Sequence, residues 1–362
     1  MSENTTEGEG IDIVRLLNEY KADIDIVLER YAPREFTRET MEAICGKPRY
    51  AYDTESATRA ISDPIWEVLD RGGKRWRPAL LLIVAEALGT DPADILDFAA
   101  ICELVHNGTL VIDDIEDQSS LRRGKPCLHL IYDLDVSINA GNAMYFLPLL
   151  VLKQRREKLP DPILLRAYEL YAQEMINVHF GQAFDIWWHS GNKEPTLDEY
   201  LQMCAYKTGT LARLSARLSA LVSGGSEEQI EAIGLFAESL GVGFQIQDDI
   251  LNLVGEEFGK GKGVGEDIHE GKRTLMAIHC ISTGSQEKAG RLREILAMHT
   301  SDPELISEAI NIIDSNGSIE FARQKAKEIV KSAWEEAESV LPSSEAKRKL
   351  QAFADYLIER DI

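Results

Sequence analysis

The sequence has few cysteines and no closely spaced pair of them. Its five cysteines are spread over 362 residues and form no CxxC motif. That spacing fits neither a zinc site nor a small disulfide-rich scaffold. We therefore expect reduced thiols in an intracellular protein.

Long apolar runs and an excess of positive charge are also absent. The longest apolar stretches, such as residues 79–85, are far shorter than the ~20 residues needed to span a bilayer. The first ten residues are acidic and polar, unlike a signal or transit peptide. A formal net charge of −22 argues against general binding to nucleic acids or anionic membranes. We expect a cytoplasmic protein with no integral membrane segment and no nucleic-acid partner.

Period-two alternation and long flexible linkers are almost missing, whereas helical periodicity is frequent. Apolar residues recur at helical spacing over residues 11–31 and 78–88. Gly, Pro, Ser and Asn signals separate the further helical patterns, at about 95–116, 137–157, 162–189, 196–223, 226–255, 273–283, 287–298, 303–315, 317–340 and 343–360. We predict an all-α protein with a disordered acidic N-terminus, residues 1–10, and one large helical bundle domain, residues 11–362.

The first cluster of acidic residues ends the apolar pattern of residues 95–116. Asp113 and Asp117 share one helix face, one turn apart. These carboxylates repel each other, and the dipole at a helix C-terminus is also unfavourable to anions. Magnesium, which binds carboxylate oxygens, water and phosphate, would relieve both penalties. A solvated acidic helix end would show the same DDxxD pattern, but Arg122 and Arg123 follow directly and can grip phosphate oxygens, which favours a metal–diphosphate site.

A second acidic cluster lies on another apolar helix. Asp248 and Asp249 follow Gln245 and precede a segment rich in Gly and Lys, residues 259–271. Acidic clusters that face each other could hold several metal ions around one diphosphate. The Gly/Lys-rich segment is either a flexible surface loop or a lid with phosphate ligands, and Lys272 favours the lid.

A basic motif stands at the start of the helix over residues 78–88. Lys74, Arg75 and Arg77 gather there after a pair of glycines, where backbone N–H groups and the helix dipole also attract anions. The motif suits a second diphosphate that is bound without metal. An ordinary basic helix entry is the alternative.

Together these segments resemble the trans-isoprenyl diphosphate synthase (polyprenyl synthetase) family, from about Asp63 to Lys272. The motifs LVIDDIEDQSSLRRGKPCLH, GQAFD, KTG and FQIQDDILNL are closest to geranylgeranyl diphosphate synthases of the eukaryotic type. The resemblance implies a helical bundle with a central substrate cavity and Mg²⁺ as cofactor. It also implies head-to-tail condensation of isopentenyl diphosphate with an allylic diphosphate (dimethylallyl, geranyl or farnesyl), geranylgeranyl diphosphate as the main product, and a homodimer or higher homo-oligomer.

The resemblance also implies roles for individual residues. The metal would be bound by acidic side chains of both clusters: Asp113, Asp117 and Asp248, supported by Asp114 and Asp249. The allylic diphosphate would be held by basic side chains: Arg122, Lys207, Lys262 and Lys272. Isopentenyl diphosphate would be held by Lys74, Arg77, His106 and Arg123. Polar groups beside the allylic carbon would steady the developing cation: Thr208 and Gln245.

Product length would be set below the first acidic cluster. The small residues Gly108 and Thr109, a turn or so before Asp113, should let the prenyl tail pass beyond farnesyl length. By resemblance, the tunnel floor would be formed by Tyr145, Phe146 and His179. Tyr145 and Phe146 could instead be ordinary core aromatics.

Several alternatives remain open from the sequence. The product could be farnesyl or a longer polyprenyl diphosphate. A terpene cyclase also ionises an allylic diphosphate beside DDxxD, but it needs no second diphosphate site such as the one around Lys74 and Arg77. A non-catalytic regulatory subunit of a prenyl synthase should have lost part of the acidic or basic set, and both sets are present here.

Overall fold

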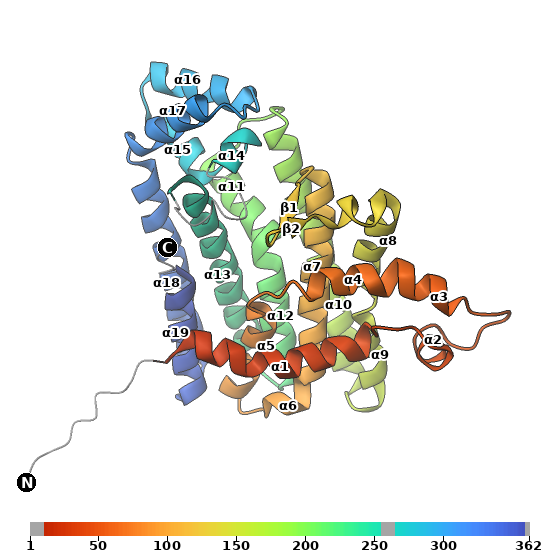
Figure 1. Cartoon of the computed structure of the whole chain (residues 1–362). Coiled ribbons are helices and arrows are strands. Elements are labelled where there is room, and N and C mark those ends of the chain that lie inside the picture. Colours follow the sequence, from red (N-terminus) through yellow and green to blue (C-terminus); the bar gives the residue numbers. More distant parts are fainter. Residues whose placement is uncertain (1–10, 255–264, 359–362) are drawn as a thin grey trace, which may run out of the picture.

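The computed structural model describes residues 11–254 and 265–358, and these form an almost entirely helical molecule (Figure 1). The all-α prediction is therefore confirmed. The predicted disorder of residues 1–10 and the predicted phosphate ligand Lys262 lie outside the described residues.

The helices of the first half are α1 (Ile13–Tyr31), α2 (Arg38–Cys45), α3 (Thr54–Ala57), η1 (Thr58–Ser62), α4 (Asp63–Leu69), α5 (Trp76–Ala87), α6 (Pro92–Ile95), η2 (Leu96–Phe98), α7 (Ala99–Glu116), η3 (Leu128–Leu130), α8 (Asp133–Phe146), α9 (Leu149–Gln154) and η4 (Arg155–Glu157). Those of the second half are α10 (Asp161–His189), α11 (Leu197–Cys204), η5 (Ala205–Gly209), α12 (Thr210–Val222), α13 (Glu227–Val254), α14 (Glu266–His269), α15 (Leu275–Thr283), α16 (Gln286–Ala297), α17 (Pro303–Asp314), α18 (Ser318–Val340) and α19 (Glu345–Ile358).

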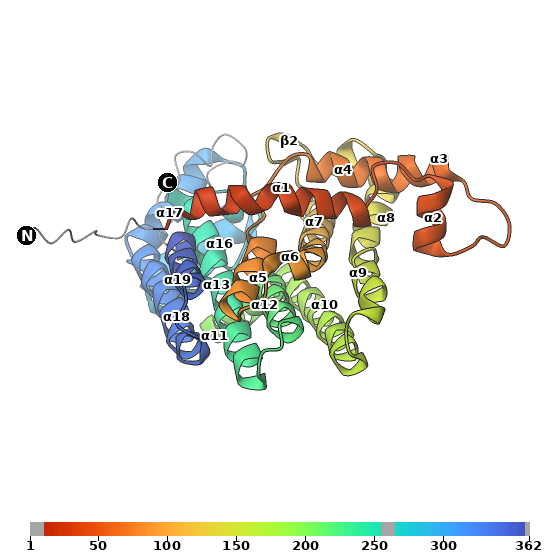
Figure 2. The same ribbon diagram turned by 90° about the horizontal axis from the view of Figure 1, so that it is seen from below.

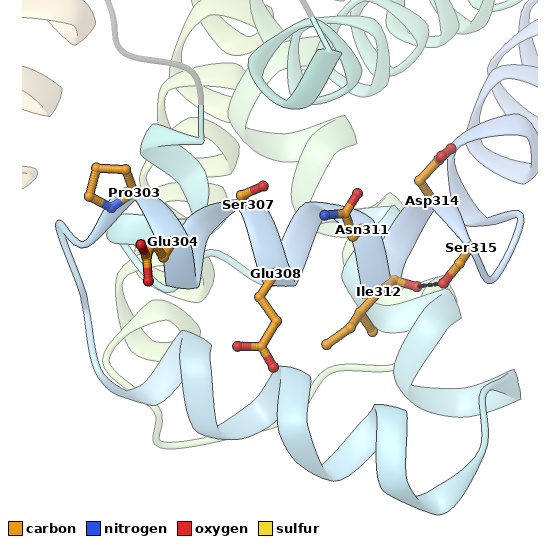
Figure 3. A pocket seen from close by; sticks show the side chains of 8 residues that line it. All are labelled: Pro303, Glu304, Ser307, Glu308, Asn311, Ile312, Asp314 and Ser315. Atoms are coloured by element: carbon orange, nitrogen blue, oxygen red, sulfur yellow. Dashed lines mark hydrogen bonds between the residues drawn. The ribbon is translucent and has the colours of Figure 1, made fainter.

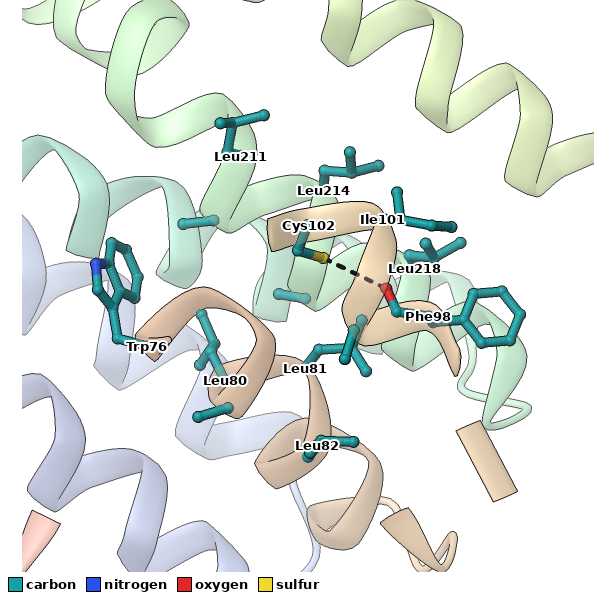
Figure 4. Packing of buried hydrophobic residues seen from close by; sticks show 14 of the residues in the cluster. Trp76, Leu80, Leu81, Leu82, Phe98, Ile101, Cys102, Leu211, Leu214 and Leu218 are labelled. Atoms are coloured by element: carbon teal, nitrogen blue, oxygen red, sulfur yellow. Dashed lines mark hydrogen bonds between the residues drawn. The ribbon is translucent and has the colours of Figure 1, made fainter. Parts of the chain in front are cut away.

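The apolar core is built around helices that are hydrophobic on nearly every side. Every residue of α5 except Glu86 is buried, so this helix has no polar face to turn to solvent. Leucines of α5 pack against Ile101 of α7 and against Leu214 and Leu218 of α12 (Figure 4). Each fully buried leucine contributes roughly 1.5–3 kcal/mol relative to an exposed one. Helix α1 lies across this layer, against α5 and α7 (Figure 2).

One predicted helix is two helices in the structure. Periodicity predicted a single helix over residues 137–157, but α8 ends at Phe146 and α9 begins at Leu149. Pro148 explains the break, because a proline offers no N–H to continue the ladder and restricts the residue before it. The early helices α2, α3 and α4 were not predicted.

A π-helical turn, η5, lies between α11 and α12 and contains Lys207 and Thr208. Such turns widen a helix locally and re-aim side chains. Helix α10 comes very close to this turn. A Cβ on Gly181 would lie 2.3 Å from the backbone nitrogen of Lys207. Glycine at this position therefore allows the contact that brings Lys207 to α10.

A short hairpin follows α7. Strands β1 (Leu121–Arg122) and β2 (Lys125–Pro126) pair antiparallel through a two-residue loop. The loop residues Arg123 and Gly124 have φ values of 54° and 74°, which is typical of a type I′ turn. The hairpin folds back over the acidic end of α7 and brings both arginines with it.

Within residues 11–254 and 265–358, two helical stretches, Pro92–Glu116 and Asp133–Glu157, are long and apolar enough to cross a membrane by length and composition alone. The first is 67% buried in its most apolar window, as a core helix of a soluble protein is. The second is 33% buried and exposes several apolar side chains. This is weak evidence for a membrane span.

Candidate active site

Most of the predicted site residues line one cavity of about 660 Å³ inside the bundle, whereas the predicted metal residues Asp114 and Asp117 do not line it. Its walls come from α5, α7, α8, α10, η5, α12, α13 and α19, together with the β-hairpin. The predicted residues that line it are Lys74, Arg77, His106, Thr109, Asp113, Arg122, Arg123, Tyr145, His179, Lys207, Thr208, Gln245, Asp248, Asp249 and Lys272. Segments nearly two hundred residues apart in sequence thus meet at one site.

Two residues predicted to line the tunnel lie elsewhere. Gly108 faces α8, where an added Cβ would lie 2.9 Å from both the Gly141 carbonyl oxygen and the Met144 Cβ. Phe146 is 70% exposed and does not line the cavity. Gly108 therefore sets how closely α7 and α8 pack, and Phe146 belongs to the outer surface.

Basic groups surround the first acidic residue of α7. The Nζ of Lys207 lies 3.2 Å from a carboxylate oxygen of Asp113, and the Arg122 guanidinium lies 3.5 Å from the other. Gln182 donates a hydrogen bond of 3.1 Å to the same carboxylate. Burial raises the pKa of Asp113, but these cations and Lys272 outweigh it and hold that pKa well below its usual range.

The second aspartate of each acidic cluster holds a neighbouring side chain in place. Asp114 is 3% exposed and accepts a 2.7 Å hydrogen bond from the Nε of Arg122. Asp249 accepts hydrogen bonds of 2.7 Å from the Tyr200 hydroxyl and 2.8 Å from the Gln245 amide. Burial, followed by the charge of Asp267, raises the pKa of Asp249 to about 8. These contacts fit the supporting role expected for Asp114 and Asp249.

Sequence reasoning missed several residues that orient the acidic end. The carboxylate of Asp185 lies 2.6 Å from the Nζ of Lys207, and Tyr200 holds Asp249. Gln182 and Asp185 are three residues apart in the GQAFD motif, so one face of α10 presents both. That spacing could have indicated from the sequence that Gln182 and Asp185 face the site together. Nothing local singled out Tyr200, whose partner is 49 residues away.

The carboxylates fit a divalent cation that also binds substrate. Within the described residues, no three His, Cys, Asp or Glu side chains lie close enough to hold a metal ion by themselves. Burial and the neighbouring charge of Asp113 raise the pKa of Asp117 to about 7, so two negative charges are costly here. A divalent cation relieves that repulsion, and diphosphate oxygens and water would complete its coordination.

The opposite side of the cavity is rich in cations. Arg77 is 6% exposed, and its Nε has no hydrogen-bond partner within the described part of the chain. Burial lowers the pKa of Arg77 to about 10. Its guanidinium lies 3.5 Å from the Nε2 of His106, whose pKa is lowered well below its usual value by burial and then by Arg77. A buried N–H of a cation without an acceptor is costly, and an anionic ligand would satisfy the Nε of Arg77.

Another hollow shares no lining residue with this cavity. It is a shallow, open surface along α17 with a volume of about 780 Å³, lined by Glu304, Glu308 and Asp314 among others (Figure 3). These acidic side chains would repel a diphosphate, so this hollow does not fit the predicted substrates.

A family model described as polyprenyl synthetase matches residues 58–313. This match covers more than half of the chain, including both acidic clusters and the basic motif. The chain belongs to the polyprenyl synthetase family. The resemblance that the motifs indicated is confirmed, as is the enzyme class, a trans-prenyltransferase.

Two relatives are similar to this protein over most of the chain. A short chain isoprenyl diphosphate synthase of Methanothermobacter thermautotrophicus is 33% identical over 315 residues, which cover 85% of this chain and 95% of that protein. A geranylgeranyl pyrophosphate synthase of Dictyostelium discoideum is 34% identical over 279 residues, which cover 77% and 88%.

Solved structures of the family have the same fold. The geranylgeranyl pyrophosphate synthetase of Pyrococcus horikoshii superimposes with a TM-score of 0.81 at 29% identity, covering 96% of this chain and 99% of that one. A geranylgeranyl pyrophosphate synthase of Corynebacterium glutamicum, complexed with isoprenyl diphosphate and magnesium, superimposes with a TM-score of 0.78 at 24% identity, covering 97% and 100%.

We expect Arg77→Met not to destabilise the free protein, because an apolar side chain replaces a buried cation. Its free energy of unfolding should equal that of the wild type or exceed it by up to about 2 kcal/mol. The same change should abolish the rise in melting temperature that isopentenyl diphosphate gives the wild type without magnesium. Thermal unfolding with and without this ligand measures both effects. Arg293→Met is the control, because the ion pair of Arg293 with Glu194 is half exposed. An undiminished rise in Arg77→Met would contradict the assignment.

Proposed function

We propose that the chain catalyses head-to-tail condensation of isopentenyl diphosphate with an allylic diphosphate, with Mg²⁺ as cofactor and geranylgeranyl diphosphate as the main product. One observation carries the proposal: a single cavity has a carboxylate end for metal and a separate basic end, where the Nε of the buried Arg77 has no hydrogen-bond partner among the described residues. A terpene cyclase needs only the first end. A non-catalytic regulatory subunit needs neither, so the complete set favours an enzyme.

At the acidic end, Asp113, Asp117 and Asp248 would hold the metal ion. When bound there, magnesium supplies electrostatic stabilisation to the diphosphate as it leaves the allylic carbon. Lys207, with the other basic residues of this end, would bind the same diphosphate oxygens. Lys207 is held by Asp113 and Asp185, and burial lowers its pKa less than these two carboxylates raise it. It therefore stays charged.

Beside the diphosphate, Thr208 and Gln245 form a polar pair. The Thr208 hydroxyl donates a 2.7 Å hydrogen bond to the Gln245 side-chain oxygen, and the Gln245 amide donates to Asp249. These bonds fix which atoms face the cavity. Oxygen atoms in this fixed arrangement would stabilise the positive charge that develops on the allylic carbon.

At the basic end, Lys74, Arg77, His106 and Arg123 would hold isopentenyl diphosphate with its double bond toward the allylic carbon. The allylic carbon–oxygen bond breaks, the double bond attacks that carbon, and the new carbon–carbon bond leaves a cation that loses a proton to the departing diphosphate. Holding the two substrates side by side in this orientation removes much of the entropic barrier to their reaction. The neutral His106 can donate to a phosphate oxygen without adding charge.

We also propose one domain over residues 11–362 and a cytoplasmic location. Helix α13 contributes buried residues to both apolar clusters of the molecule, which supports a single folding unit. The strongly negative net charge and the burial of α7 support a soluble protein.

The function is tested by incubating the purified protein with isopentenyl diphosphate, each allylic primer and Mg²⁺, and separating the dephosphorylated products. We expect the main product to have a twenty-carbon chain, as in geranylgeranyl diphosphate. Each condensation adds one five-carbon unit to the allylic primer. Asp113→Asn should lower kcat/KM by about a hundredfold or more while the protein still folds with a lower melting temperature, because it removes the charge at the metal site that also pairs with Lys207 and Arg122. Asp314→Asn, in the hollow along α17, is the control. Equal activity of both variants would refute the metal site.

Product length should depend on Tyr145 and His179. Their rings meet edge to face with centroids 5.7 Å apart, and both line the cavity. We expect Tyr145→Ala to open the floor and lengthen the product beyond geranylgeranyl diphosphate. Phe146→Ala should leave the product length unchanged, because Phe146 lies outside the cavity. Chromatography that shows the same product from Tyr145→Ala and wild type would overturn this assignment of the floor.

We propose that the outer face of α8 and α10 pairs with a second copy of the chain. Exposed apolar side chains gather on these helices: Leu134, Ile138, Phe146, Ile176, Phe180 and Trp187. A self-complementary pairing of identical faces would close as a homodimer. Sedimentation should show a dimer for the wild type and for Ile26→Glu on α1, but a monomer for Ile176→Glu. A dimeric Ile176→Glu variant would exclude this face.

A further inference from the structure

Arg75 stands in the middle of the basic motif, but its side chain points away from the cavity. The neighbouring Lys74 and Arg77 line the cavity, whereas Arg75 is 4% exposed and does not. Its backbone has a left-handed conformation, with φ of 51° and ψ of 33°. This conformation is costly for a residue with a side chain. A compensating interaction is therefore expected.

The guanidinium of Arg75 connects several elements. Its NH1 lies 2.6 Å from the Oε1 of Glu103 on α7, and its Nε lies 3.2 Å from the Oδ1 of Asp25 on α1. Its NH2 donates a 3.0 Å hydrogen bond to the carbonyl of Leu69 at the end of α4. Burial lowers the pKa of Arg75, but the attraction of Glu103 and Asp25 outweighs that effect, so the group remains charged.

Glu103 is equally enclosed. Its side chain is 2% exposed, and its Oε1 also accepts a 2.7 Å hydrogen bond from the Asn107 amide. It precedes His106 by three residues, so both belong to the same stretch of α7 but only His106 lines the cavity. The contact between Arg75 and Glu103 thereby joins the segment that carries Lys74 and Arg77 to the helix that carries His106.

We propose that the buried ion pair Arg75–Glu103 positions the isopentenyl diphosphate site by fixing the basic motif against α7. Stability alone explains the pair poorly, because apolar residues of similar volume stabilise a core as well as or better than a buried ion pair. A fixed register matters at a site where cations from two elements must meet one diphosphate, since small displacements weaken multidentate binding. This inference rests on the proposed function.

The test compares variants that differ in which part of the pair they remove. Glu103→Gln keeps the shape and the acceptor for Asn107 but removes the charge. Arg75→Gly removes the side chain and accepts the left-handed backbone without strain, so it separates the role of the side chain from that of the backbone. Arg75→Lys keeps the charge and loses the forked contacts. Glu174→Gln is the control, because Glu174 forms a buried pair with Arg213, at 2.6 and 2.7 Å, away from the cavity.

Melting temperatures, the KM of each substrate and the calorimetric affinity for isopentenyl diphosphate are measured for all variants. Glu103→Gln and Arg75→Gly should raise the KM and Kd of isopentenyl diphosphate about tenfold, with the KM of the allylic substrate changed less than about twofold. The KM and Kd of Arg75→Lys for isopentenyl diphosphate should lie between the values of these two variants and those of the wild type. Glu174→Gln should lose stability only. If Glu103→Gln misfolds, Arg75→Lys decides the outcome.

Opposite results overturn the inference in recognisable ways. If the wild type condenses the substrates but Glu103→Gln and Arg75→Gly behave like Glu174→Gln, or raise both KM values together, the pair is structural and the proposed function stands. If the wild type forms no prenyl diphosphate, the proposed function fails first, whatever the variants do.

Discussion

Asp113 keeps a negative charge while partly buried at the end of an apolar helix, and much of the cavity is arranged around that charge. A lone carboxylate in this place would take up a proton, because burial disfavours the charged form. Lys207 prevents this from the side of η5, and Arg122 does so from the hairpin. Lys207 in turn needs Asp185 and the close approach that Gly181 permits. The acidic end thus depends on contacts among α7, α10 and η5.

The basic end is built on the opposite principle. Its buried cation, Arg77, has an Nε without a hydrogen-bond partner in the described part of the chain, so the free protein bears a cost that a bound diphosphate would remove. Such a site lowers the stability of the free protein and raises its affinity for the diphosphate. Arg75 differs from Arg77 in this respect, because Glu103, Asp25 and the Leu69 carbonyl accept hydrogen bonds from its guanidinium. It can therefore hold its position whether or not substrate is bound, which suits a residue that orients others.

Helix α8 links product length to assembly. Tyr145 turns its ring into the cavity, and the next residue, Phe146, turns outward to the exposed apolar face. Consecutive residues on an α-helix point about 100° apart, so one short helix can serve both surfaces. A second copy on the outer face would restrain the same helix that forms the floor. Assembly and product length are therefore physically connected in the proposed dimer.

The sequence by itself determined the helical class, the family and most of the residues of the cavity. Both acidic clusters and the basic motif consist of residues close together in the chain, so their chemistry is visible in short segments such as DDIED and GGKRWRP. Tertiary structure decided which way side chains point. It turned Gly108 toward α8, Phe146 toward the surface and Arg75 away from the cavity. These directions depend on contacts between segments far apart in the chain, which no local pattern records.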